Sequence, residues 1–288
     1  MIMAMAVLSV VLFSCVREEM TCDKELIVVQ RIGEGGYVYT RGTVISSNTD
    51  LKEETFGLYG SLTPNASVPQ PYFNASATVN ADLTATISPL QYWPGLLNAS
   101  MKFFSWYPYS DANAPTTSFT DPGEMVLNYT ANESAANHID VLAAISGPVW
   151  VEGVNIHFYH TLTKVTFTFK KVAPVPNEVT IEQIEFQNVG KSGNLAMTEI
   201  PTTTTKNGKP KFVWSDVATG KVASTPTGNK TVTEDATLIG DTFLMLPTDA
   251  FSATAKIVVT TNFGDREFLF SDILAKNPHS WESGEYIN

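Results

Sequence analysis

The sequence predicts an all-β fold with two β-sandwich domains in tandem behind an N-terminal leader. Apolar and β-branched runs recur between clusters of Gly, Pro, Asn and Asp, which is typical of strands joined by turns. No segment sustains the period of about 3.6 residues expected of a long amphipathic helix. The length of 288 residues fits two domains or one unusually large all-β domain.

The composition excludes several classes of function. Apolar residues make up 43% of the chain, which is enough for a core, and charged residues only 16%, below the typical value of about 25%. The formal net charge of −11 repels phosphate backbones, so we expect no nucleic-acid partner. Two Cys and four His leave little material for a disulfide scaffold or a transition-metal site, so we expect no metal and no cofactor apart from a covalent lipid.

The leader determines the expected compartment. Residues 1–13 are an apolar run as long as a signal-peptide core and shorter than the roughly 20 residues of a transmembrane helix. Leu12 lies three residues before Cys15 and Ser14 directly before it, which resembles the lipobox of bacterial lipoproteins. We therefore predict that residues 1–14 are a signal peptide and that Cys15 is lipidated.

Alternatives to lipidation remain open. No Lys or Arg precedes the apolar run, although a signal peptide normally begins with basic residues. The run also fits a plain secretory peptide or a buried strand. A disulfide between Cys15 and Cys22 would compete with acylation and ranks second.

The strands are predicted from the apolar runs in chain order. They cover residues 26–29, 55–59, 77–87, 101–107, 154–169, 179–189, 212–214, 242–246, 255–261 and 267–270. A short helix is expected only around residues 134–137.

A Pro-rich stretch divides the chain near its middle. Pro174 and Pro176 cannot both lie inside a central strand, and Lys170 and Lys171 beside them favour solvent. We therefore expect a leader over residues 15–41, an N-terminal sandwich over 42–172 and a C-terminal sandwich over 173–288.

Several motifs follow one another along the whole chain. They are TRGT at 40–43, FGLY at 56–59, QYWP at 91–94, MKFFSWYP at 101–108, DVLAA at 140–144, VNIHFYHTLTKVTF at 154–167, FLMLP at 243–247 and WESGEY at 281–286. In this order they resemble the fimbrillin family, in its Mfa-like lipoprotein branch from Bacteroidetes-type anaerobes. The resemblance implies a β-sandwich subunit of a cell-surface fimbria, exported as a lipoprotein and assembled at the outer membrane.

The resemblance also implies a removable first strand. In the family this strand fills a groove of the N-terminal sheet until a protease specific for Arg or Lys cuts behind it. A strand of a neighbouring subunit then takes its place by strand addition. The matching strand here contains Leu26, Ile27, Val28 and Val29.

The implied cleavage site follows Arg41. Gly33, Gly35 and Gly36 would give a protease a flexible loop before it. Arg31 is the second choice, because the residue after it would extend the strand and protect the bond. The alternative is that the glycines form a plain hairpin turn between two permanent strands.

Partners and position in a fimbria follow from the same resemblance. The expected partners are other pilus subunits, the outer membrane through the lipid before processing, and a host or bacterial surface ligand. The chain ends two residues after Tyr286, where stalk subunits of the family continue into a donor segment. A subunit that accepts a strand but donates none fits a tip position, and a truncated chain is the competing explanation.

Candidate chemical sites favour structural roles. His157 and His160 are three apart in one strand and point to opposite faces, so we expect His160 to be a hydrogen-bonded core residue. No phosphate loop, nucleophile elbow or zinc motif is present, so we expect no enzyme. The aromatic residues between 92 and 109 favour packing, but they leave a second hypothesis, a non-assembling surface lipoprotein that binds glycans through exposed aromatics.

Overall fold

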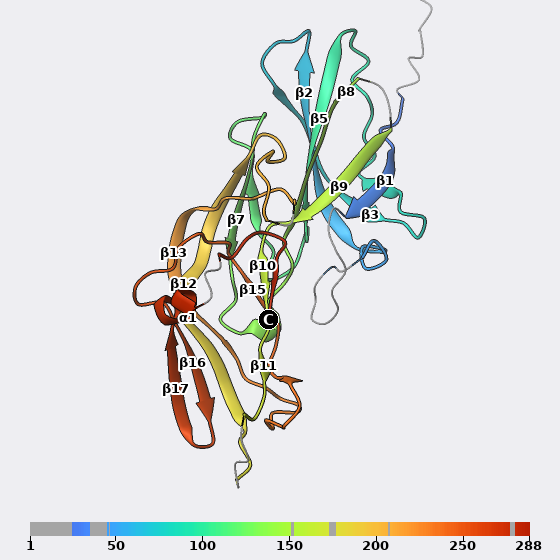
Figure 1. Cartoon of the computed structure of the whole chain (residues 1–288). Coiled ribbons are helices and arrows are strands. Elements are labelled where there is room, and N and C mark those ends of the chain that lie inside the picture. The colour runs from blue at the N-terminus through green and yellow to red at the C-terminus, as the bar shows by residue number, and fades with distance from the viewer. Residues whose placement is uncertain are drawn as a thin grey trace, which may run out of the picture.

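The computed structural model describes residues 25–34, 45, 47–150, 153–172, 177–206, 208–276 and 280–288. Its strands and sheets confirm the all-β prediction. The predicted signal peptide, Cys15, Cys22 and Arg41 lie outside the described residues. The molecule is elongated, with one group of strands at each end (Figure 1).

Seven strands of the N-terminal half form a sheet that closes on itself, which we call the closed sheet. Their order around it is β1-β4-β3-β2-β5-β8-β9. The bounds are β1 Val29–Glu34, β2 Thr55–Pro64, β3 Gln70–Val79, β4 Ala85–Ser88, β5 Ala99–Tyr107, β8 Leu142–Val149 and β9 Val154–His160.

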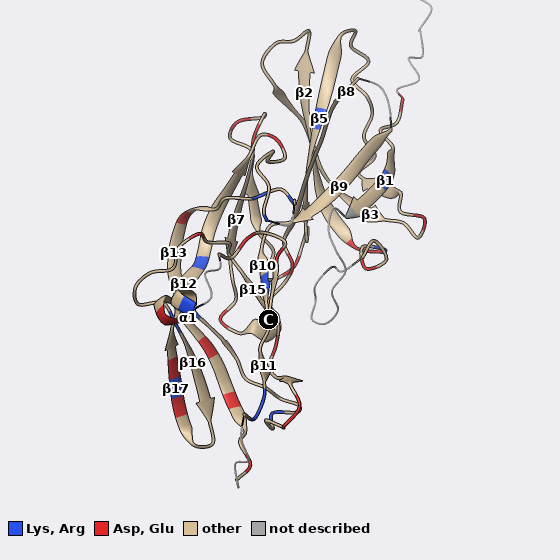
Figure 2. Ribbon diagram, viewed as in Figure 1, with Lys and Arg blue, Asp and Glu red and all other residues tan. Residues whose placement is uncertain are grey.

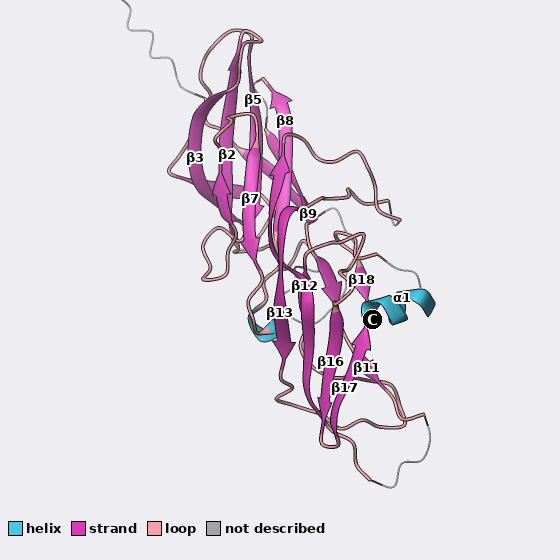
Figure 3. Cartoon of the chain, turned by 90° about the vertical axis from the view of Figure 1, so that its left-hand side faces the viewer, coloured by secondary structure: helices cyan, strands magenta, loops and turns pink. Residues whose placement is uncertain are grey.

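The other half is built around the long strand β12, Ile181–Met197. This strand joins β17, β16, β7 and β6 in one sheet and also pairs with β13. The bounds are β6 Thr116–Ser118, β7 Met125–Thr130, β13 Ser215–Ser224, β16 Lys256–Thr261 and β17 Gly264–Leu269. Figure 3 shows β12, β13, β16 and β17 below the labelled strands of the closed sheet, whereas β7 extends upward to the level of β2.

Shorter strands complete this half. A three-stranded sheet has the order β15-β10-β18, and β11 pairs with β14. The bounds are β10 Thr163–Val165, β11 Thr168–Phe169, β14 Thr237–Leu238, β15 Phe243–Met245 and β18 Tyr286–Ile287. Strand β18 near the end of the chain pairs in parallel with β10, so it belongs to the sheet of this half.

Strand β5 forms a wall shared by two hydrophobic cores. Phe103 points into the core enclosed by the closed sheet, whereas Phe104 and Trp106 belong to the core of the second half. The neighbouring strand β2 does the same with Leu58 and Tyr59. Successive strand residues face opposite sides, so apolar residues at adjacent positions fit a strand buried on both faces. This arrangement explains the run of aromatic residues in β5.

The predicted division at residue 172 does not separate the two halves. Strands β6 and β7 precede it but pair in the sheet of β12, and β10 and β11 pair with C-terminal strands. The reason is that Met125, Leu127 and Tyr129 of β7 carry apolar side chains into the second core. The pairing of strands, and not the position of the Pro-rich stretch, therefore decides which half of the molecule a segment joins.

Local predictions were wrong at several further places. Residues 212–214 form no strand, and residues 154–169 form three strands, β9, β10 and β11, in place of one. Residues 77–87 form two strands, because a turn around Asp82 interrupts them; its Oδ1 accepts hydrogen bonds from the backbone N–H and hydroxyl of Thr84. The predicted strand 267–270 ends at Leu269, and helix α1, Phe270–Lys276, begins there. The 3-10 helix Ala135–Asn137 confirms the helix expected in that region.

We predict that Gly57→Ala destabilises the fold. Gly57 of β2 lies opposite Trp106, and a Cβ added at Gly57 would lie 2.1 Å from a ring carbon of that buried side chain. Displacing the indole should lower the free energy of unfolding by about 1–3 kcal/mol, the usual cost of overpacking. Chemical denaturation measures the change. The control Gly228→Ala meets no atom within 4 Å and should change the stability little; equal losses in both variants would refute the explanation.

Candidate functional site

Strand β1 closes the sheet between β4 and β9. It runs parallel to β9, with Val29 opposite Val154 and Ile32 opposite Ile156. On its other side it is antiparallel to β4, with Val29 opposite Ala85. Strand β1 spans Val29–Glu34, so of the predicted strand 26–29 only Val29 lies in it, and Gly33 and Glu34, which were expected in the loop, belong to the strand. Leu26 makes an isolated bridge with Tyr92.

The residues before β1 are also hydrogen-bonded to the body of the closed sheet. The Ile27 N–H donates to the Gln91 carbonyl at 2.9 Å, and the Trp93 N–H donates to the Glu25 carbonyl at 2.8 Å. The Val154 N–H donates to the Val28 carbonyl at 2.9 Å. Main-chain bonds thus hold the segment 25–29 on both sides.

Side chains of this segment alternate between the core and solvent. Ile27 is 3% exposed and Val29 0%, whereas Leu26 is 38% exposed and Val28 46%. Ile32 is again fully buried, three residues after Val29. All three buried side chains join the core that also contains Phe103 and Phe158.

Ile45 marks the place where the described chain resumes after β1. Its side chain is buried, and its N–H donates to Asp140 Oδ2 at 3.2 Å. The same carboxylate oxygen lies 2.9 Å from His160 Nδ1. Arg41 lies between β1 and Ile45, outside the described residues.

The two histidines of β9 differ in their surroundings. His160 contacts the buried Asp140, as expected of a hydrogen-bonded residue near the core, and His157 is exposed. Lys164 lines the same small cavity as Asp140 and His160 and lies 5.3 Å from the ring centroid of Tyr286. Burial lowers the pKa of Lys164, and the negative charge of Asp140 opposes that shift. These groups attach the C-terminal strand to the end of the closed sheet.

The aromatic residues between 92 and 109 mostly pack inside the protein. Trp93, Phe103, Phe104 and Trp106 are buried, whereas Tyr92 and Tyr109 are partly exposed. The hydroxyl of Tyr72 donates to the Tyr92 carbonyl at 2.8 Å. These four buried side chains therefore pack inside the protein, which is the interpretation that the sequence favours.

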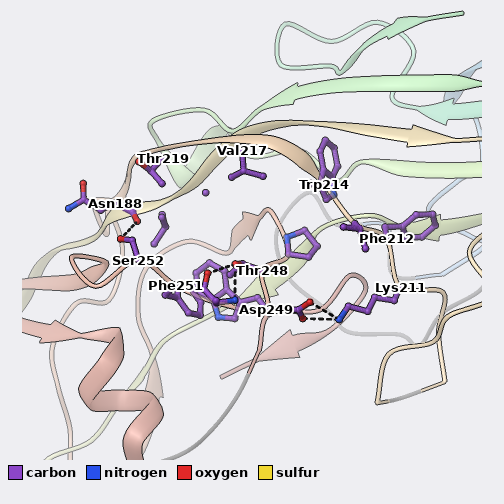
Figure 4. A pocket seen from close by; sticks show the side chains of 16 residues that line it. Asn188, Lys211, Phe212, Trp214, Val217, Thr219, Thr248, Asp249, Phe251 and Ser252 are labelled. Carbon is purple, nitrogen blue, oxygen red and sulfur yellow. Dashed lines mark hydrogen bonds and ion pairs between the residues drawn. The ribbon is translucent and has the colours of Figure 1, made fainter.

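A pocket of about 270 Å³ lies between β13 and the loop after β15 (Figure 4). Its charged groups bind each other, since Lys211 Nζ donates to both Asp249 oxygens at 2.8 and 2.9 Å. The aromatic side chains of Phe212, Trp214 and Trp281 that line it are buried. Among the aromatic residues that line the pocket, only Phe251 is partly exposed.

Among the side chains that the structure describes, no group of three or more His, Cys, Asp or Glu residues could hold a metal ion. Within the same residues, no helix is both long and apolar enough to cross a membrane. Figure 2 shows that the acidic residues concentrate on β12, β17 and several loops, away from most strands of the closed sheet.

Comparison with models of protein families finds a match over most of the chain. A model described as fimbrillin-like matches residues 40–288. Among curated protein sequences none matches the chain.

Solved structures share the fold. A fimbrial protein from Bacteroides vulgatus superposes with a TM-score of 0.54 at 15% identity, over 82% of this chain and 86% of that one. A candidate cell adhesion protein from Bacteroides uniformis has a TM-score of 0.54 at 16% identity, over 93% of this chain and 91% of that one. At this level of identity the likeness concerns the fold alone.

We predict that the buried residues of β1 stabilise the closed sheet and that the outward ones do not. Ile32→Ala should lower the free energy of unfolding by about 2–5 kcal/mol, the usual cost of a cavity in a core. Val28→Ala, on the exposed face, should change it by less than about 0.5 kcal/mol. Denaturant unfolding of the two variants compares them, and similar losses would show that β1 does not complete the core.

Proposed function

The chain belongs to the fimbrillin-like family, and we propose that it is a structural subunit of a cell-surface fimbria assembled by donor-strand exchange. In this proposal the protein is exported as a lipoprotein through Cys15 and cleaved after Arg41. Other fimbrial subunits are its partners, and the outer membrane holds it before processing. The observation that carries the proposal is that β1, the first strand that the structure describes, closes the sheet between β4 and β9.

A terminal strand can leave without threading the rest of the chain. Loss of residues 25–34 would expose the backbone edges of β4 and β9 and uncover the apolar side chains of Val154, Ile156 and Phe158. An open edge above an apolar floor pairs readily with another strand. A neighbouring subunit's strand would restore both the main-chain bonds and the core, which is strand addition.

The contacts also favour Arg41 over Arg31 as the cleavage site. Arg31 lies inside β1, opposite Asn155, so a cut there would need the strand to leave first and would keep Ile32 in the body. A cut after Arg41 would free the whole strand, while Ile45 and its bond to Asp140 would stay with the body. Proteases need an accessible segment whose backbone groups are free, and in a strand that is paired on both sides these groups are already hydrogen-bonded.

The alternative, a non-assembling lipoprotein that binds glycans, has less support. Its binding surface would consist of exposed aromatics, but the largest aromatic residues of β5 are in the two cores. No second function is proposed.

Lipid anchoring predicts the behaviour of a single variant. Cys15→Ala should move the protein from the membrane fraction to the soluble fraction, because two or more acyl chains anchor a protein stably and none would remain. Cys22→Ala should leave it in the membrane fraction. Fractionation with metabolic fatty-acid labelling tests this, and continued labelling of Cys15→Ala would contradict lipidation at that residue.

Processing predicts the first product of limited digestion. An Arg-specific protease should release a fragment ending at Arg41, and residues 42–288 should stay folded. Arg41→Ala should abolish this product and the assembly that follows it, whereas Arg31→Ala should not. N-terminal sequencing of the large fragment identifies the bond, and a first cut inside the second half would count against the assignment.

A further inference from the structure

Strand β1 has one residue more than its partner β9 over the same stretch of pairing. From Val29 to Ile32 it advances three residues, while its partners on β9 advance two, from Val154 to Ile156. On the other side only Val29 is paired with β4, opposite Ala85, and the Ile32 N–H donates at 2.7 Å to the carbonyl of Leu83, which lies in the turn before β4. The extra residue lies at Gln30, where the register shifts.

Such a β-bulge leaves one residue without a partner and disrupts the ladder locally. The partners Val154 to Phe158 on β9 are consecutive, so the irregularity belongs to β1. The Gln30 side chain lies over Gly153, where an added Cβ would come within 1.7 Å of its Cδ. A regular strand would pair with β9 throughout and would bury every second side chain without the bulge.

We infer that the groove between β4 and β9 fits a bulge-free strand with apolar side chains at positions i, i+2 and i+4, and that β1 is its weaker placeholder. This inference rests on the proposed donor-strand function. The occupant is a strand of a neighbouring subunit, and the better register supplies a driving force for its entry. The native apolar spacing of i, i+2 and i+5, from Ile27, Val29 and Ile32, is the feature that distinguishes β1 from the expected donor.

Charge indicates the chemistry of this donor. Neither β4 (ATIS) nor β9 (VNIHFYH) contains Lys, Arg, Asp or Glu. The neighbouring core residues are apolar, including Phe56 and Leu58. Recognition therefore depends on main-chain bonds and apolar burial, and the affinity of the donor should change little with salt concentration.

Peptide exchange on the folded full chain tests the inference. A specific protease site is inserted between Gly36 and Tyr37, and the chain is cut so that the native strand stays bound without a covalent link. Fluorescent peptides are then added in excess: residues 25–34, the same peptide without Gln30, the same peptide with Gln30→Ala, and the Gln30-deleted peptide with Val29→Ser and Ile32→Ser. Fluorescence anisotropy measures the affinity at low and high salt.

The Gln30-deleted peptide should bind about fivefold to tenfold more tightly than the native one, the change expected from one regained main-chain hydrogen bond. The Gln30→Ala peptide keeps the extra residue and should bind no more tightly than the native one, which separates the bulge from the side chain. The double Ser peptide should not bind measurably. Salt should change none of these affinities by more than about twofold.

Two outcomes would overturn the inference in distinguishable ways. Equal or weaker binding of the Gln30-deleted peptide would refute the preference for a regular strand, while exchange of the native peptide would leave the proposed function intact. No exchange by any peptide would refute both.

Discussion

The fold of the N-terminal half depends on the closure of one sheet by β1. Three buried side chains, Ile27, Val29 and Ile32, complete a core whose other members come from strands far along the chain. Main-chain hydrogen bonds to β4 and β9 hold the same strand. The backbone groups of β1 are thus paired and its apolar side chains are buried at the same time. Because only non-covalent contacts would hold the strand once the chain is cut after it, an equivalent strand from another molecule could meet the same requirements.

The second half is protected from the loss of β1 by the shared wall of β2 and β5. Phe103 and Phe104 are adjacent in sequence but belong to different cores. The second core keeps its own strands, β7 and β12, and the C-terminal segment through β18. The Asp140–His160 pair also holds Ile45, so the chain after the proposed cleavage site stays attached. These contacts are what a subunit needs in order to remain folded while one groove is open.

The sequence predicts the parts of this arrangement that depend on local pattern. Alternation places His157 and His160 on opposite faces, because strand side chains alternate strictly. It does not tell Ile27 and Val29 from Leu26 and Val28, because all four residues are apolar. The bulge could also have been recognised, since Val29 and Ile32 are three apart with Gln30 and Arg31 between them. The pairing of β7 with β12 could not, because it joins segments about 65 residues apart whose apolar patterns fit many partners. Helix α1 is too short to show a period, and its first residue, Phe270, continues the apolar end of the preceding strand β17.

The central claim is that β1 can leave while the rest of the molecule stays folded, and native-state hydrogen exchange tests it most directly. The amides of Ile27, Ile32 and Val154 report the bonds of β1, and the amides of β12 report the second core. If the account is correct, the first group exchanges through a partial opening whose free energy is clearly below that of global unfolding. Exchange of both groups with the same free energy and the same denaturant dependence would show that β1 leaves only when the whole protein unfolds, and would contradict the account.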